Sequence, residues 1–188
     1  LAGCIVGVVE RGELITGERI EAGDEIWAFP SSGLHTNGYS LARHIVFNNA
    51  GLSVGDEIPG AGGSLADLLL AVHRSYLPEI RSMRKVVDLR GLAHITGGGL
   101  IDNIPRILPE GRSVEIDRSA WDTPPLFRYL GETGGVDDLE MHRVFNMGIG
   151  MVAIVPAADS GQVHDGDYRW KPFKIGKVTV GSGEVRLV

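Results

Sequence analysis

The sequence has little cysteine, little lysine and no long apolar stretch, and each scarcity excludes a class of protein. Its single cysteine, Cys4, rules out an intrachain disulfide and a cysteine-based zinc site, and fits a reducing, cytoplasmic compartment. Only 4 of the 18 basic residues are Lys. The sequence has no block of consecutive Lys and Arg residues, so we expect no nucleic-acid partner. No apolar run approaches the roughly 18 residues of a membrane helix, so we expect neither a membrane span nor a signal peptide.

What remains is the composition of a single globular domain. The 188 residues are 43% apolar and 22% charged, with a net charge of −6. Glycine is abundant, at 27 residues, which is about twice the average of ~7%. No triplet repeat accompanies it, so collagen is excluded, and the excess belongs in turns, bulges or loops that approach a ligand closely. The chain opens at Leu1 inside an apolar run, which predicts a domain of a longer protein.

The hydrophobic pattern predicts an α+β fold with one mixed sheet packed against helices. Apolar runs and alternation predict strands at 2–9, 25–30, 92–96, 113–117 and 147–155. Helical spacing and start signals predict helices at 39–49, 64–73, 78–84, 100–104, 124–131 and 137–144. We further expect a turn-rich hairpin region at 10–25 and a final hairpin over 175–188, turning at 181–183.

Two segments share one design, in which a strand leads through a polar glycine loop into a helix. They run from Phe29 to Ser40 and from His94 to Ile104. At such a loop the backbone N–H groups and the helix dipole favour an anion. Neither segment is a P-loop or a dinucleotide fingerprint. A plainer interpretation, in which the glycines only make tight turns, stays open.

His35 is the candidate for proton chemistry, because it lies between Gly33 and Gly38 beside hydroxyl and amide side chains. A general base, a phosphate ligand and a cap are all compatible with that position. His94 ends a predicted strand and has a structural interpretation as well. The other four histidines share no ligand spacing, so we expect no metal site in this chain.

Together these segments resemble one family, the aminoimidazole ribonucleotide synthetases, or phosphoribosylformylglycinamidine cyclo-ligases. The resemblance rests on three motifs in the family's order, at 31–40, 94–106 and 145–151. It covers nearly the whole chain but only the C-terminal half of the family's protein. It implies that residues 1–188 are one C-terminal domain, and that a separate N-terminal half carries the dimer interface and most contacts to ATP and Mg²⁺.

The implied reaction closes the imidazole ring of formylglycinamidine ribonucleotide in purine synthesis, at the cost of ATP. The resemblance implies a small-molecule substrate and a homodimeric full-length ligase. His35 would be the catalytic residue. The implied substrate-binding residues are Ser32, Gly33, Thr36, Asn37, Gly38, Thr96, Gly97, Gly98, Gly99, Asn103, Asn146 and Gly148.

Two departures from the family and two alternatives accompany this interpretation. Residues 158–172 are poor helix material where the family has an amphipathic helix, and Met147 stands where some members have Cys. The chain also resembles related ATP-binding proteins: formylglycinamide ribonucleotide amidotransferase, selenophosphate synthetase, thiamine-phosphate kinase and a hydrogenase-maturation protein. A non-catalytic module that binds a nucleotide-like ligand is the alternative from another class.

Overall fold

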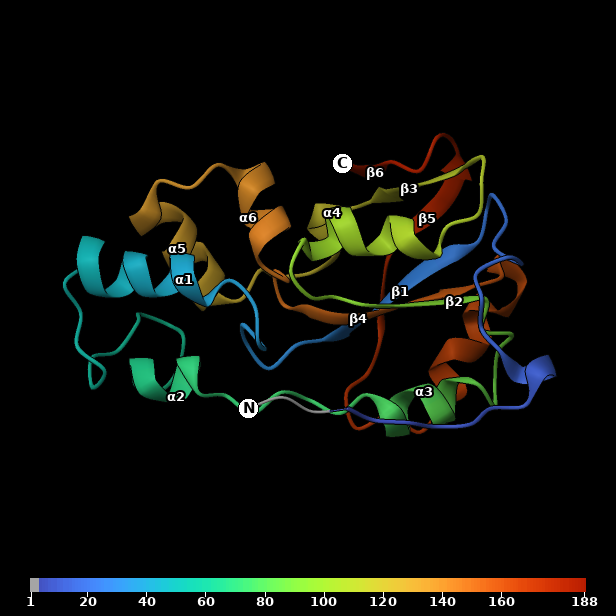
Figure 1. The fold of residues 1–188 in the computed structure, drawn as a ribbon, viewed down its shortest axis with the longest axis horizontal. Coiled ribbons are helices and arrows are strands. Elements are labelled where there is room, and N and C mark those ends of the chain that lie inside the picture. The colour runs from blue at the N-terminus through green and yellow to red at the C-terminus, as the bar shows by residue number, and fades with distance from the viewer. Residues whose placement is uncertain (1–3) are drawn as a thin grey trace.

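One six-stranded sheet organises residues 4–188, the part of the chain that the computed structural model describes (Figure 1). The strand order is β2-β4-β1-β5-β3-β6. The strands are β1 (Glu25–Pro30), β2 (Gly91–His94), β3 (Arg112–Ile116), β4 (Ile149–Val155), β5 (Phe173–Val180) and β6 (Val185–Leu187). Every neighbouring pair is antiparallel except β3 with β6, which is parallel. The expected mixed sheet and α+β class are confirmed.

Short helices connect the strands. The α-helices are α1 (Tyr39–Arg43), α2 (Leu65–Leu69), α3 (Leu77–Met83), α4 (Gly99–Asn103), α5 (Pro125–Gly134) and α6 (Asp138–Val144). A π-helix, His44–Asn49, continues α1, and four 3-10 helices lie at Arg11–Glu13, Ile104–Ile107, Arg118–Ala120 and Ala157–Asp165. None of the helices within residues 4–188 combines the length and apolarity needed to cross a membrane.

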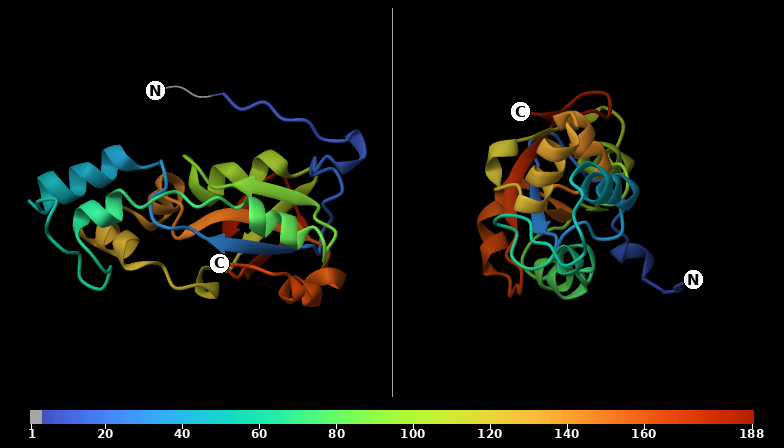
Figure 2. Two further views of the ribbon diagram at one scale, coloured as in Figure 1. Left: turned by 90° about the horizontal axis from the view of Figure 1, so that it is seen from below. Right: turned by 90° about the vertical axis from the view of Figure 1, so that its left-hand side faces the viewer.

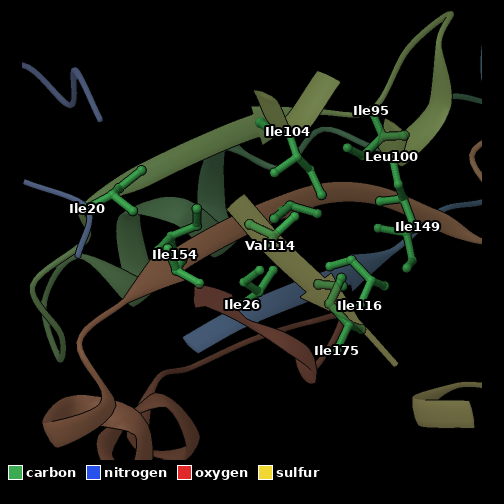
Figure 3. Packing of buried hydrophobic residues seen from close by; sticks show 14 residues of the cluster. Ile20, Ile26, Ile95, Leu100, Ile104, Val114, Ile116, Ile149, Ile154 and Ile175 are labelled. Carbon is green, nitrogen blue, oxygen red and sulfur yellow. The ribbon is translucent and has the colours of Figure 1, made fainter. Parts of the chain in front are cut away.

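Strands β1 and β4 are apolar on both sides because both faces of the sheet are covered there. In β1, Ile26 and Ala28 point to one face, while Trp27 and Phe29 point to the other. The first face packs under α4 and the 3-10 helix that follows it, as Figure 3 shows for the labelled isoleucines. The second face packs on α3 and the 3-10 helix Ala157–Asp165 (Figure 1).

A third apolar cluster lies beyond one end of the sheet. Helices α1, α2, α5 and α6 gather there, on the left of Figure 1. Their buried side chains include Ala42, Leu65, Phe127 and Met141. Ser64 begins α2 through a reciprocal capping box with Asp67, as its sequence predicts, but α2 ends at Leu69 rather than near residue 73. The junction between this helical lobe and the sheet is where the glycine loops lie.

The strand expected at 2–9 is wrong over its described part. Residues 4–9 form no secondary structure, and their side chains are exposed; Ile5 is 98% and Val6 90% accessible. Residues 2 and 3 lie outside the described chain. Figure 2 shows the segment as an extended trace that runs along the length of the molecule, set apart from the other elements. Nothing within residues 4–188 covers the segment.

The two expected hairpins are also wrong. Residues 10–24 hold turns and the 3-10 helix Arg11–Glu13 rather than paired strands, because the glycines there make turns only. At the other end, β6 pairs with β3 and not with β5. Contacts distant in sequence explain this pairing. The Ser113 hydroxyl accepts N–H hydrogen bonds from Gly183 and Glu184, and these bonds hold the end of the chain beside β3. Residues 157–165, poor α-helix material, form a 3-10 helix.

Candidate functional site

Strand direction brings three loops to one edge of the sheet. Both β1 and β2 run antiparallel to β4, so the two strands end at the edge where β4 begins. The glycine loop at 31–38 follows β1, the glycine loop at 95–98 follows β2, and residues 145–148 lead into β4. The three motifs that carried the family resemblance therefore meet in space, although more than 100 residues separate the first from the last.

Asn146 joins the first of these loops to the start of β4. Its side chain is 3% exposed, and its Nδ2 donates to the carbonyl oxygen of Gly33 at 2.8 Å. Its Oδ1 accepts from the Ser31 hydroxyl at 3.1 Å and from the Gly148 N–H at 2.8 Å. An amide that is buried and bonded on both sides holds loop geometry rather than reaching toward a ligand.

Asn103 does the same for the second loop. Its Nδ2 donates to the carbonyl oxygens of Gly97 and Gly99, at 3.2 and 2.8 Å. Its Oδ1 accepts from the Thr96 hydroxyl at 3.0 Å and from Arg106 at 3.1 Å. Asn103 thus ties together the side chain of Thr96 and the backbone carbonyls of the loop.

The helix that follows each loop starts at a glycine without a side-chain cap. Gly38 precedes α1 with φ 76° and Gly98 precedes α4 with φ 100°, both left-handed. Neither position receives a side-chain hydrogen bond, so no side chain satisfies the first N–H groups of the helix. The loops adjoin, since a Cβ on Gly97 would lie 3.5 Å from Oδ1 of Asn37. Two sets of backbone donors therefore open at neighbouring positions.

His35 is the buried polar residue of the first loop, at 4% exposure. Its backbone has φ 57°, a left-handed conformation that is uncommon outside glycine. Its Nε2 accepts a hydrogen bond from the Ser32 N–H at 3.1 Å. Burial lowers the pKa of His35 to about 4, helped by the neighbouring His73, His94 and Arg74. The ring is therefore neutral at physiological pH, which suits a positioning role better than an acid.

The remaining predicted residues divide into exposed and packed positions. Thr36 and Gly97 are exposed, and Ser32 is half-buried with its hydroxyl donating to the carbonyl oxygen of Val72. Gly99 and Gly148 are buried by packing: a Cβ would lie 1.9 Å from the His142 carbonyl oxygen and 2.7 Å from the Pro124 ring, respectively. These two glycines permit close backbone contact inside the protein.

Sequence reasoning missed the segment between α2 and α3, which lies against the first loop. The His73 ring stacks on His35, with centroids 3.9 Å apart, and its Nε2 lies 3.1 Å from Nε2 of His94. Burial and His73 lower the pKa of His94. Arg74 and Tyr76 both donate to the carbonyl oxygen of Pro30. No spacing in the sequence signals this grouping, because it depends on strand pairing.

Two pockets border this region, and Arg74 lines both. One, of about 200 Å³, is lined by the first loop, including Ser31 and Ser32, together with residues of the helical lobe. The other, of about 310 Å³, is lined by His73 and His94 with the apolar side chains of α3. The edge of the sheet thus offers backbone donors, imidazoles and one guanidinium beside open volume.

The same fold occurs in solved structures of two enzymes. Thiamine-monophosphate kinase from Stenotrophomonas maltophilia K279a matches with a TM-score of 0.58 at 18% identity, covering 95% of this chain and 54% of that one. The hydrogenase maturation protein HypE in complex with ATP matches with a TM-score of 0.52 at 19% identity, covering 91% and 49%. These two matches show that the α+β fold of this chain also occurs in those proteins.

The family follows from the sequence: the chain belongs to the AIR synthase related proteins, C-terminal domain, whose family model matches residues 21–188. It is 50% identical over 161 residues to the phosphoribosylformylglycinamidine cyclo-ligase of Burkholderia vietnamiensis, covering 85% of this chain and 45% of that protein. It is 43% identical over 187 residues to the chloroplastic enzyme of that name from Arabidopsis thaliana, covering 97% and 47%. The chain spans about half the length of these relatives.

Proposed function

We propose that this chain is the C-terminal half of a phosphoribosylformylglycinamidine cyclo-ligase. One observation supports the proposal. Helices α1 and α4 each follow a glycine, Gly38 or Gly98, which supplies no side-chain cap, and the loops that contain these glycines adjoin at one edge of the sheet. The names of relatives at 43–50% identity support this activity over that of the kinase and maturation proteins, which match at 18–19%.

The substrate of that reaction is formylglycinamidine ribonucleotide. An amide oxygen is a poor leaving group, so ATP phosphorylates the formyl oxygen and leaves as ADP. The amidine nitrogen then attacks the activated carbon, the C–O bond breaks, and phosphate departs with that oxygen as the ring closes. Such chemistry depends on positioning and on donors where charge develops, rather than on a protein nucleophile.

Each group at the edge has a part in this proposal. The backbone N–H groups of Thr36, Gly38, Gly97 and Gly98 bind anionic or polar parts of the substrate, whereas those of Asn37 and Gly99 already donate to backbone carbonyl oxygens within their loops. His35, neutral and held by Ser32, positions the substrate inside the first loop. Asn103 and Asn146 support the two loops from behind.

The rest of the enzyme lies, on this proposal, in a separate N-terminal half. ATP and Mg²⁺ bind mainly there, because Mg²⁺ prefers carboxylate and water oxygens, whereas the loops here offer chiefly N–H groups, amides and imidazoles. That half also forms the homodimer. The full-length protein is cytoplasmic and has no nucleic-acid or membrane partner.

A chimera tests the proposal. Residues 21–188 replace the matching C-terminal part of the Burkholderia vietnamiensis relative, and both proteins are assayed with formylglycinamidine ribonucleotide, ATP and Mg²⁺. We expect the chimera to form the imidazole product with one phosphate released per turnover. A chimera that folds and binds ATP, yet forms no product where the intact relative does, would contradict the proposal.

A further inference from the structure

Arg74 carries an uncompensated positive charge beside the first glycine loop. It lies in the segment between α2 and α3, is half-buried, and lines both pockets at this edge of the sheet. No other residue that lines either pocket is a Lys or an Arg. Within residues 4–188 no carboxylate forms an ion pair with Arg74. In a chain with a net charge of −6, this guanidinium is therefore open to an anion from outside the chain.

Two contacts fix the orientation of the Arg74 guanidinium. Its Nη1 donates to the carbonyl oxygen of Pro30, at the end of β1, at 2.8 Å. Its Cζ lies 4.8 Å from the centre of the Trp170 ring. A guanidinium has five N–H groups, and the bond to Pro30 uses one of them. A planar group held in place with unused donors is suited to bind a phosphate through two parallel hydrogen bonds.

The first glycine loop supplies a second donor to the smaller pocket. Gly33 lines that pocket together with Arg74. The carbonyl oxygen of Gly33 accepts from Asn146, whereas its N–H has no acceptor within residues 4–188. Its φ of 142° lies in a region that favours glycine, so the backbone conformation that presents this N–H depends on the residue type.

The smaller pocket has the size and the lining for one anionic group. Its volume is about 200 Å³, whereas pockets that enclose a whole small ligand usually measure ~300–1,000 Å³. Its walls include Leu68, Pro124 and Phe127, and apolar walls that exclude water reduce the screening of a charge pair. The larger pocket contains no residue of the first loop, so the anion belongs in the smaller one.

We propose that Arg74 and the Gly33 N–H bind the 5′-phosphate of the substrate ribonucleotide. This inference rests on the proposed function, which makes the substrate a phosphate monoester. Such an ester carries about −1.5 to −2 charges near neutral pH, and an arginine remains protonated throughout that range. Trp170 is a positioning residue, because it holds Arg74 and is not among the residues that line the pocket. The donors at Gly38 and Gly98 then serve the reacting end of the substrate.

A binding experiment on the 188-residue chain tests the site directly. Ribose 5-phosphate and ribose are titrated separately while the amide signal of Gly33 is followed by NMR. We expect a saturable shift with ribose 5-phosphate and none with ribose. Arg74→Gln should weaken the binding by about 10- to 100-fold, the effect of losing a hydrogen bond to a charged group. Arg169→Gln is the matched control, because its guanidinium lies 5.0 Å from the same Trp170 ring but lines neither pocket.

Folding of each variant is checked by its unfolding temperature. The Nε–H signal of Arg74 in the wild-type chain provides a measurement that needs no substitution, and ribose 5-phosphate should shift it. An Arg74 signal that does not move at saturation would overturn the inference. Equal affinities for ribose and ribose 5-phosphate would overturn it too, as would equal losses in folded Arg74→Gln and Arg169→Gln.

Kinetics of the chimera separate this inference from the proposed function. Arg74→Gln in the chimera should raise KM for the ribonucleotide by about 10- to 100-fold, retain most of kcat and leave KM for ATP unchanged. A higher KM for ATP alone would assign Arg74 to the transferred phosphate and overturn the inference. An active chimera in which Arg74→Gln changes no constant would contradict the inference but not the proposed function. An inactive chimera, with ribose 5-phosphate still bound through Arg74, would contradict the proposed function and support the phosphate site.

Discussion

His35 combines a left-handed backbone, burial and neutrality, and each property has a consequence. Its φ of 57° is one that Asn adopts more readily than Ala does. Asn at this position therefore preserves the loop while removing the imidazole, whereas Ala disturbs both. Experiments on this residue need both substitutions, since a loss seen only with Ala reports on the backbone.

The depressed pKa of His35 makes the stability of the chain depend on pH. An unfolded histidine titrates near 6.5 and folded His35 near 4, so between these values the unfolded chain binds more protons. Stability contributed by neutral His35 is therefore present above pH 6.5 and is lost as the pH falls toward 4. From pH 7 to pH 5 the expected loss is about 2 kcal/mol.

Denaturant unfolding at pH 7 and pH 5, in the presence of a chelator, measures this difference. His35→Asn should lose less stability over the same interval than the wild-type chain, because it lacks the titrating ring. Equal losses in the two proteins would show that His35 is not a buried neutral imidazole.

Asn146 offers a second prediction at this scale. Asn146→Ala leaves the Gly33 carbonyl, the Gly148 N–H and the Ser31 hydroxyl without their shared partner in a buried place. We expect a loss of about 2–3 kcal/mol in unfolding free energy. Ser182→Ala is the control, since its hydroxyl bonds only to an exposed neighbour. A change below 0.5 kcal/mol at Asn146, a value typical of exposed positions, would contradict this account.

At the scale of elements, Gly99 fixes the start of α4 against α6. A Cβ there would lie 1.9 Å from the backbone oxygen of His142, and φ is 56°. Gly111 is the matched control, because its φ of 79° is also left-handed but its Cβ would meet open space. Gly111→Ala should cost about 1–2 kcal/mol for conformation alone.

Gly99→Ala adds a backbone clash to that conformational cost. We expect it to exceed the loss at Gly111 by at least about 2 kcal/mol, because α4 and α6 must separate. Thermal or denaturant unfolding of the two variants measures the difference. Similar losses at Gly99 and Gly111 would show that α4 and α6 do not pack as described.

The elements also show what the sequence could and could not predict. The glycine loop after β1 and the helix after it followed from local pattern, because Pro30 ends the strand and glycines precede periodic apolar residues. The pairing of β6 with β3 did not, since it depends on hydrogen bonds from Gly183 and Glu184 to distant Ser113. A glycine turn indicates that the chain reverses or bends, but not which strand comes next to it.

At the scale of the molecule, the sequence predicted the two glycine loops and the place of His35 in the first of them, but not the position of His73 beside them. The loops carry glycine signals in the sequence, and strand direction then brings them together. His73 carries no local signal, because it meets His35 and His94 only after β2 pairs with β4. Likewise, the apolar run at 4–9 predicted a buried strand, whereas the structure leaves these residues exposed, because hydrophobicity alone does not supply a strand to pair with.

The isolated chain should fold but not turn over substrate. It contains the sheet, all three apolar clusters and the edge loops, whereas the proposal assigns most ATP and Mg²⁺ contacts to a separate half. Purified chain given formylglycinamidine ribonucleotide, ATP and Mg²⁺ should release no phosphate above background. Steady turnover would show that residues 1–188 contain a complete active site.

The most direct measurement is the steady-state kinetics of the chimera carrying His35→Asn or His35→Ala. If the first loop positions the substrate, His35→Asn should retain most of kcat and chiefly raise KM. A loss of about 10²–10⁴-fold in kcat for both variants would instead assign proton transfer to His35 and contradict the positioning role. Unchanged kcat and KM in both variants would remove His35 from the site, and the functional interpretation of this edge with it.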